Sequence, residues 1–177
     1  FTMPSGYSGK KGQNLNPYGP ITFDTSGSSS GSATVVAADF APLAIGTETT
    51  GSIVAPATQQ SVVGLRPSLG MVSRAGIIPL AEALDTAGPM ARTVKDAATL
   101  FNTMVGYDEK DAMTEKMKDR DRIDYTNDLS IDGLKGKKIG ILFSVDQQDE
   151  NRKAVAEKIR KDIQDAGAIL TDDIQLS

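Results

Sequence analysis

Two short segments rich in glycine and serine carry the side chains of this sequence that are best suited to chemistry. They span residues 26–32 and 46–57. Gly27 and Gly51 allow sharp turns that expose consecutive backbone N–H groups. Ser52 follows such a turn, at the start of a run of small residues. A serine hydroxyl in that position suits nucleophilic attack on a carbonyl carbon, with neighbouring N–H groups facing the oxyanion that forms.

On the residues alone, two other interpretations of these segments stay open. A Gly/Ser cluster is most often a flexible or turn-forming loop. Glycines that precede a helix can also bind an anion. No Gly-Lys-Ser or Gly-Lys-Thr follows here, however, which argues against a phosphate-binding P-loop.

The composition narrows the chemistry further. The chain has 177 residues and contains neither histidine nor cysteine. It therefore has no Ser-His-Asp triad, histidine metal site, thiolate nucleophile, zinc ribbon or disulfide framework. Acid–base chemistry must fall to Ser, Thr, Lys, Tyr, Asp, Glu or Arg.

Charge and hydropathy indicate an ordinary globular protein. The net charge is −4, the isoelectric point is about 4.9 and the mean hydropathy is −0.24. These values argue against nucleic acid or an acidic membrane surface as a partner, because both bind basic faces. No apolar run has membrane-spanning length and no signal peptide begins at Phe1, so we expect a cytoplasmic protein.

Regular elements must bring the two segments together. The small apolar residues of 33–40 predict a helix, and 43–47 predicts a buried strand. The helix travels about 13 Å away from the first segment, and the strand returns by about 15 Å. We therefore expect both segments at one end of the structure, with the hydroxyls of Ser28 and Ser52 able to meet.

The remaining patterns predict a mixed α/β fold. Thr93-Val-Lys-Asp96 matches a capping box and precedes an amphipathic helix that Gly106 ends. The other expected elements are a loop over 1–20, a strand over 62–65, a charged exposed connection over 108–132, a strand over 137–143, a helix that contains Val155, Ile159 and Ile163 and ends at Gly167, and a strand over 168–170. The expected parts are a core over 1–107, the connection over 108–132 and a strand-helix-strand segment over 133–177.

The two segments resemble the signature of the amidase signature family of serine hydrolases. That family has a Gly-Ser-Ser-Gly/Ser-Gly core and then Gly-x-Asp/Glu-x-x-Gly-Ser-Ile followed by x-x-Pro-Ala, which here are residues 27–32 and 46–57. Further similar motifs span residues 63–67, 70–74, 76–79 and 84–94. The resemblance covers about residues 5–112 and implies a mixed β-sheet core covered by helices.

The resemblance implies a catalytic role for two serines. Ser52 matches the nucleophile that becomes acylated. Ser28 matches the bridging serine, whose peptide bond to Gly27 is cis in the family. The third catalytic group is a lysine whose motif falls upstream of Phe1, so we expect this lysine to be absent from the chain and the chain to be an internal fragment.

The resemblance also places the oxyanion on the backbone amides of Thr49, Thr50, Gly51 and Ser52. In the implied mechanism, a neutral lysine accepts a proton through Ser28 while Ser52 attacks a carboxamide carbon. Ammonia or an amine leaves, and water then frees the acyl-enzyme. No cofactor and no metal is implied, and without the lysine this chain alone is expected not to hydrolyse amides.

Details of the sequence refine the resemblance. Lys10 and Lys11 lie in a polar, turn-rich segment and suit a solvated surface better than the role of the missing lysine. Thr50 replaces a usual glycine and Val54 replaces a frequent arginine. Residues 47–54 are most similar to the peptide-amidase branch, and the missing arginine favours a neutral or peptide amide as substrate.

Two alternative functions stay open. The later motifs resemble equally the amidase-type component of a glutamyl/aspartyl-tRNA amidotransferase, which would need partner subunits and glutamine. The other alternative is a binding module with inert serines. In the amidase interpretation, the expected partners are a small-molecule or peptide amide and the remainder of the polypeptide.

Charged residues are rare in the first half of the chain. Residues 1–92 hold only five of the 19 basic and five of the 23 acidic residues. In this charge-poor half, Arg74, Asp85 and Arg92 are expected to be buried or paired. We expect Arg74, Asp85 and Arg92, together with Gly27, to support the site structurally.

Other groups have less specific patterns. Tyr7 and Tyr18 either line a pocket or pack beneath the first loop. The acidic residues within 146–150 and 172–173 fit solvated turns better than a metal site. We therefore expect no metal centre.

Overall fold

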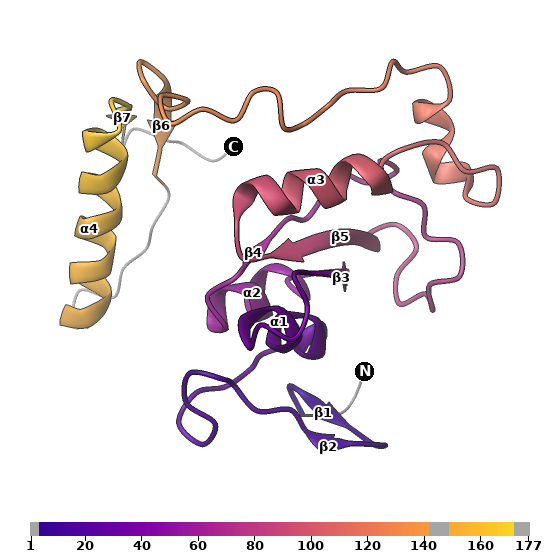
Figure 1. Ribbon diagram of the computed structural model, residues 1–177, viewed down its shortest axis with the longest axis horizontal. Coiled ribbons are helices and arrows are strands. Elements are labelled where there is room, and N and C mark those ends of the chain that lie inside the picture. The colour runs from indigo at the N-terminus through magenta and orange to yellow at the C-terminus, as the bar shows by residue number, and fades with distance from the viewer. Residues whose placement is uncertain (1–3, 142–148, 172–177) are drawn as a thin grey trace. The chain divides into compact units, whose positions relative to one another are not determined.

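The computed structural model describes residues 4–141 and 149–171, and the chain divides into two units, Phe1–Asn127 and Asp128–Ser177 (Figure 1). The elements of the first unit are β1 (Tyr7–Ser8), β2 (Gly12–Gln13), α1 (Ser30–Ala37), β3 (Leu43–Glu48), α2 (Val54–Gln59), β4 (Val63–Gly64), β5 (Thr86–Ala91), α3 (Val94–Met104) and the 3-10 helix η1 (Ala112–Met117). Strands β1 and β2 form a short antiparallel hairpin within the segment that the sequence predicts as loop.

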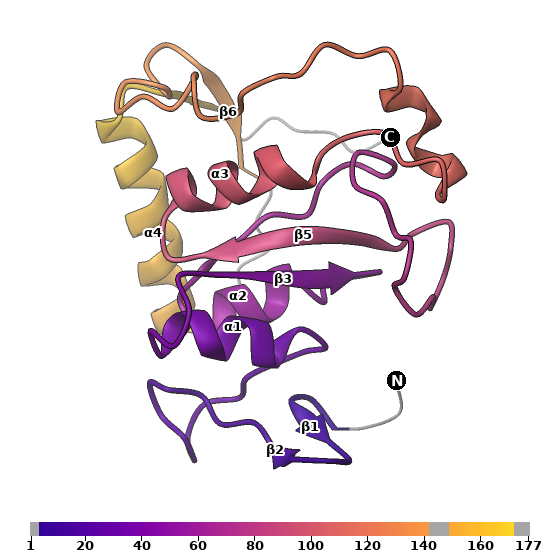
Figure 2. The ribbon, with the colours of Figure 1, turned by 45° about the vertical axis from the view of Figure 1, so that its right-hand side comes forward.

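Strand β5 is the central strand of an antiparallel sheet with the order β3-β5-β4. The β3–β5 register runs from Leu43↔Ala91 to Glu48↔Thr86. Ala87 packs with Phe101 of α3, whereas Met90 packs with Ala33 of α1. Figure 2 shows α3 on one side of the sheet and α1 and α2 on the other. All six residues of β5 are buried, because both faces of the strand are covered.

No strand is predicted from the sequence over the residues of β5. A glycine and a proline at its centre are both unfavourable in a strand interior. The structure shows why Gly88 is there: a Cβ atom at this position would lie 2.0 Å from the carbonyl oxygen of Leu65. The N–H of Leu65 donates to the carbonyl of Pro89 at 3.1 Å. Close approach of a neighbouring chain segment therefore accounts for the glycine.

The predicted helices α1 and α3 are confirmed, with small shifts. Helix α1 begins and ends three residues earlier than predicted, and Asp39 beyond it has a φ of 60° in the left-handed region. The Thr93 hydroxyl accepts the N–H of Asp96 at 3.1 Å, which caps α3 as expected. Helix α2 is not predicted. It tolerates Pro56 in its first turn, where backbone N–H groups have no acceptor within the helix.

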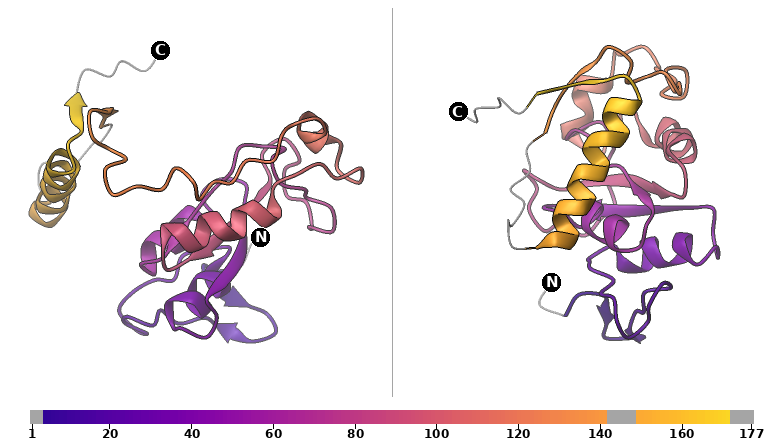
Figure 3. Two further views of the ribbon diagram at one scale, coloured as in Figure 1. Left: turned by 45° about the horizontal axis from the view of Figure 1, so that its top comes forward. Right: turned by 90° about the vertical axis from the view of Figure 1, so that its left-hand side faces the viewer.

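The second unit has the predicted strand-helix-strand order. Its elements are β6 (Lys138–Gly140), α4 (Glu150–Asp165) and β7 (Ile169–Thr171), and β6 and β7 are parallel (Figure 3). The Asp149 carboxylate accepts the N–H of Arg152 at 3.1 Å and caps α4. Residues 142–143, 146–148 and 172–173, which belong to predictions above, lie outside the described residues. None of the helices in the described ranges is long and apolar enough to cross a membrane.

The charged stretch over 108–132 is not an exposed connection throughout. Asp111, Thr114 and Met117, in and next to η1, are buried. The Thr114 hydroxyl accepts the N–H of Asp108 at 2.9 Å and donates to the carbonyl of Asp111 at 2.8 Å. The expectation of exposure is therefore wrong for Asp111, Thr114 and Met117, whereas the residues between them are exposed. The polar groups of Asp111 and Thr114 are used in hydrogen bonds within the first unit.

Candidate active site

The two Gly/Ser-rich segments meet at a cavity of about 630 Å³. Ser28 is exposed, Ser52 is half-buried, and both line this cavity. Beside Ser28, the N–H of Ser29 donates to the carbonyl of Ser52 at 3.2 Å. The expectation that α1 and β3 return the two segments to one end of the structure is therefore confirmed.

Serine hydroxyls attach the first segment to the free edge of β3. The Ser29 hydroxyl donates to the carbonyl of Thr47 at 3.1 Å and accepts the Thr47 N–H at 3.0 Å. The Ser32 hydroxyl donates to the carbonyl of Ile45 at 2.8 Å. These side chains take the hydrogen bonds that a neighbouring strand would otherwise make. The two bonds of Ser29, which is adjacent to Ser28, fix the position of Ser28 relative to the strand that leads to Ser52.

The backbone of both segments has unusual conformations. The Gly27–Ser28 peptide bond is cis, the geometry that the resemblance implies for a bridging serine. Gly51 has a φ of 94°, in the region that favours glycine. This conformation turns the chain sharply between the end of β3 and Ser52.

The turn from Thr49 to Ser52 leaves its amides free. The N–H groups of Ile53 and Val54, which follow it, both donate to Glu48. The N–H groups of residues 49–52 find no acceptor within the part of the chain that the structure describes. Consecutive unpaired N–H groups beside a serine hydroxyl are the donors that a developing oxyanion requires.

Asp85 holds this turn against the loop that precedes β5. Its Oδ1 accepts the hydroxyl of Thr49 at 2.5 Å, and its Oδ2 accepts the N–H groups of Leu80 at 2.7 Å and Ala81 at 2.9 Å. The hydrogen bond from Thr49 and then that from Leu80 lower the pKa of the Asp85 carboxyl. Asp85 borders the cavity. Both of its carboxylate oxygens already accept hydrogen bonds from the protein, so Asp85 has a structural role.

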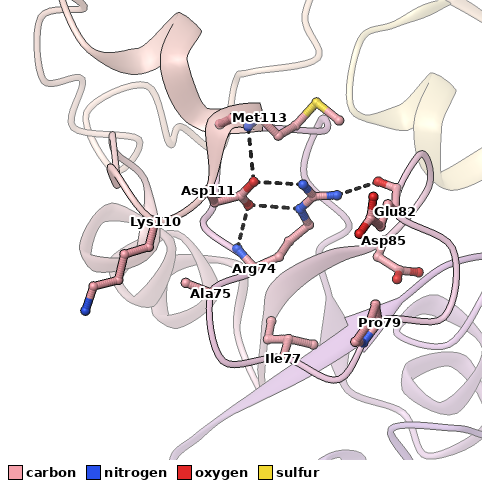
Figure 4. Close-up of a pocket in the computed structure, with 10 residues that line it drawn as sticks. Arg74, Ala75, Ile77, Pro79, Glu82, Asp85, Lys110, Asp111 and Met113 are labelled. Carbon is pink, nitrogen blue, oxygen red and sulfur yellow. Dashed lines mark hydrogen bonds and ion pairs between the residues drawn. The ribbon is translucent and has the colours of Figure 1, made fainter.

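Arg74 lines a second cavity of about 600 Å³ (Figure 4). Its guanidinium donates to Asp111 from Nε at 2.9 Å and from Nη2 at 2.7 Å, and its backbone N–H donates to the same carboxylate at 2.8 Å. A further bond joins the guanidinium to the carbonyl of Glu82. The side-chain hydrogen bonds lower the pKa of Asp111 and raise the pKa of Arg74. Arg74 therefore ties the segment before β5 to η1.

The other candidates lie outside the first cavity, except Tyr7, which lines it. Arg92 is paired, as expected, but it is exposed and not buried. It contacts Asp39 at 2.5 Å and donates to the carbonyl of Val36 at 3.3 Å, so it supports the end of α1. The remaining candidates, Tyr18, Lys10 and Lys11, are exposed and do not line the cavity.

Two site residues are missed from the sequence. Glu48 is buried, borders the cavity and pairs with Arg66, whose Nε lies 3.1 Å from Glu48 Oε1. The signal was present, because both are isolated charges in the charge-poor half of the chain. The sequence pattern does not say that they pair with each other across 18 residues.

Removal of the Asp111 carboxylate should destabilise the first unit. Asp111→Asn leaves Arg74 without its buried partner, which we expect to cost about 3 kcal/mol at neutral pH. The folded-state pKa of Asp111 lies below its ordinary value. The stabilisation is therefore complete above the unfolded-state pKa of about 3.9 and is lost as the pH falls through the folded-state pKa. The difference in stability between the wild type and Asp111→Asn should shrink between about pH 5 and pH 2.

Urea unfolding followed by tyrosine fluorescence measures this effect. All four tyrosines lie in the first unit, and the chain has no tryptophan. Asp39→Asn, which removes an exposed ion pair with Arg92, is the matched control and should change stability by less than about 1 kcal/mol. A difference between wild type and Asp111→Asn that stays constant across the pH range would contradict the assignment.

The chain is similar to known proteins in both sequence and structure. A model of the protein family described as Amidase matches residues 2–174. The crystal structure of an amidase family protein from Bacillus anthracis str. Ames is 90% identical, with a TM-score of 0.94 over 100% of this chain and 35% of that chain. The native peptide amidase from Stenotrophomonas maltophilia is 47% identical, with a TM-score of 0.88 over 94% of this chain and 34% of that chain.

A curated relative from a tRNA amidotransferase has about the same sequence identity to this chain as the peptide amidase has. A glutamyl-tRNA(Gln) amidotransferase component from Acinetobacter baylyi is 46% identical over 149 residues, which are 82% of this chain and 30% of that protein. The chain thus spans about a third of the length of the proteins it matches. The matches confirm a mixed α/β fold of the kind expected from the sequence.

Proposed function

Because the chain belongs to the Amidase family, we propose that it is the nucleophile-bearing segment of a hydrolase that cleaves the C–N bond of carboxamides. The observation that carries the proposal is the meeting of Ser28 and Ser52 at one cavity, where the turn that ends at Ser52 has four consecutive amides without an acceptor among the described residues. The 177 residues contain no histidine and no cysteine, so neither a Ser-His pair nor a thiolate nucleophile can be formed from this segment.

The proposed mechanism uses two serines and a lysine. The Ser52 hydroxyl attacks the carboxamide carbon while its proton passes through the Ser28 hydroxyl to a neutral lysine N-terminal to Phe1. The N–H groups of residues 49–52 bind the oxyanion. The same proton leaves with ammonia or the amine, and water then attacks the ester formed on Ser52 and releases a carboxylic acid. The full-length enzyme of this proposal is a longer polypeptide that contains both this segment and the lysine.

The lining of the cavity favours an uncharged substrate. Tyr7, Ile77, Ile78 and Leu80 supply apolar surface to the cavity that the two serines line. No lysine or arginine is among the described residues that line the cavity, so a carboxylate on the substrate would meet no cation there. We therefore favour small-molecule amides or peptide amides, without a cofactor, a metal or nucleic acid, in a cytoplasmic enzyme.

Glutamine hydrolysis within a tRNA-dependent amidotransferase is the second candidate. The 46% identity to an amidotransferase component favours it, whereas the lack of a cation for the glutamine carboxylate in the described part of the cavity argues against it. Assays of the full-length enzyme with glutamine, alone and with partner subunits, separate the two. Glutaminase activity that depends on partner subunits would favour this second candidate.

The proposed function predicts activity that depends on the length of the polypeptide. The full-length enzyme should release the chromophore from a chromogenic peptide amide, and a fluorophosphonate should label Ser52. The 177-residue chain should release none, because the proposed base is outside it. A burst of chromophore from the 177-residue chain that disappears in Ser52→Ala would contradict the claim that the catalytic base lies outside this chain. Failure of the full-length enzyme to label at Ser52 would favour a binding module with inert serines.

A further inference from the structure

An ion pair between buried Glu48 and half-buried Arg66 adjoins the turn that carries the nucleophile. Only 4% of the Glu48 side chain is exposed, and Arg66 is the cation that neutralises it. A buried charge is unfavourable unless it is paired and hydrogen-bonded. Neither side chain exchanges protons or bonds in the proposed mechanism. We propose that Glu48 and Arg66 are positioning residues that set the orientation of the turn before Ser52, an inference that rests on the proposed role of Ser52.

The pair contacts both ends of the turn. Glu48 Oε2 accepts the N–H groups of Ile53 at 2.7 Å and Val54 at 2.9 Å, immediately after the nucleophile. Arg66 Nη2 donates to the carbonyl of Thr49 at 3.3 Å, where the turn begins. The same nitrogen donates to the carbonyl of Leu84 at 3.0 Å. One ion pair therefore fixes the start and the end of a four-residue turn.

These contacts decide which way the peptide groups point. In a trans peptide, the C=O and N–H groups point in opposite directions. The Thr49 carbonyl points to Arg66, so the N–H of Thr50 points away from Arg66. The Ile53 N–H points to Glu48, so the carbonyl of Ser52 points to the opposite side, where Ser29 donates to it. The ion pair thereby leaves the Thr50 amide free for an oxyanion.

Removal of the Arg66 charge and removal of the Glu48 charge should reduce activity to different extents. Arg66→Met removes the contact with Thr49 and leaves an unneutralised carboxylate next to the place where an oxyanion forms. Glu48→Gln keeps one oxygen that can accept from Ile53 and Val54, but its amide group meets the Arg66 guanidinium as a second donor. A variant with both changes removes the two charges together. The loss should therefore be largest for Arg66→Met and should not be additive in the double variant.

The test is steady-state kinetics of the full-length enzyme on a chromogenic peptide amide, normalised to active sites titrated with a fluorophosphonate. We expect kcat per titrated site to fall about 100-fold in Arg66→Met and at least about 10-fold in Glu48→Gln, with KM within about twofold. The double variant should be no worse than Arg66→Met. Arg66→Lys should recover only part of the rate, because lysine lacks the planar fork that reaches Glu48 and Thr49 together.

Normalisation to titrated sites separates positioning from stability. A merely structural role would reduce the number of titrated sites and the Tm but leave kcat per site at the wild-type value. Asp39→Asn removes an exposed ion pair with Arg92 and is the control that should leave kcat unchanged. If Arg66→Met does not fold, the near-isosteric Glu48→Gln and the Arg66→Lys variant decide the question.

Each outcome supports or overturns a specific claim. Wild-type kcat per site in both Arg66→Lys and Glu48→Gln would overturn the positioning role and leave the proposed function intact. A wild-type enzyme whose Ser52 does not titrate, or a Ser52→Ala variant that titrates normally, would overturn the proposed function and the positioning role with it. A fall in kcat per site without a change in KM supports both.

Discussion

Ser52→Ala should abolish amide hydrolysis by the full-length enzyme. We expect kcat/KM to fall by about 10⁴-fold or more, equivalent to about 5.5 kcal/mol of transition-state stabilisation. The reason is that the alanine removes the oxygen that forms the acyl-enzyme, while the free amides of residues 49–52 can still polarise the substrate carbonyl. The measurement is the rate of chromophore release together with fluorophosphonate labelling, which should disappear.

The control for Ser52→Ala is a hydroxyl in the following helix. Thr58 is exposed on α2, and its hydroxyl donates to the carbonyl of Val54 at 2.8 Å. Thr58→Ala removes one hydroxyl close in sequence but outside the cavity, and should retain the wild-type rate and labelling. Residual activity of Ser52→Ala above about one per cent would show that another group is the nucleophile.

Ser28→Ala should have the second largest effect. It removes the hydroxyl that we propose as the proton relay between Ser52 and the lysine, so kcat should fall about 10³-fold. Ser52 keeps its own hydroxyl and its free amides, and the carbonyl of Ser52 still accepts from Ser29. Slow labelling by a fluorophosphonate should therefore persist, unlike in Ser52→Ala.

Ser32→Ala is the matched control for Ser28→Ala. Ser32 lies in the same segment and donates to Ile45 of β3 at 2.8 Å, but it does not line the cavity. Its loss should lower stability by about 1 kcal/mol and leave kcat per labelled site close to the wild-type value. Equal losses of kcat in the two variants would indicate that Ser28 acts through the fold of the segment and not as a relay.

Local features of the sequence determined a large part of this protein. The spacing of Ser28 and Ser52 predicted that one helix and one returning strand would bring them together, because both lengths follow from backbone geometry. The Thr93 cap and the apolar positions behind it predicted α3, since capping acts within a single turn. The family resemblance rests on the same contiguous residues and so did not depend on knowledge of the fold.

The tertiary structure alone decided which distant residues complete the site. Strand β5 has both faces covered and contains Gly88 for the close approach of Leu65, so its own sequence has no strand pattern. Asp111 belongs to a charged stretch that suggests exposure, yet it is buried against Arg74. Glu48 and Arg66 pair across 18 residues next to the nucleophile turn. Such contacts depend on where separate segments meet after folding, which local propensity and spacing do not specify.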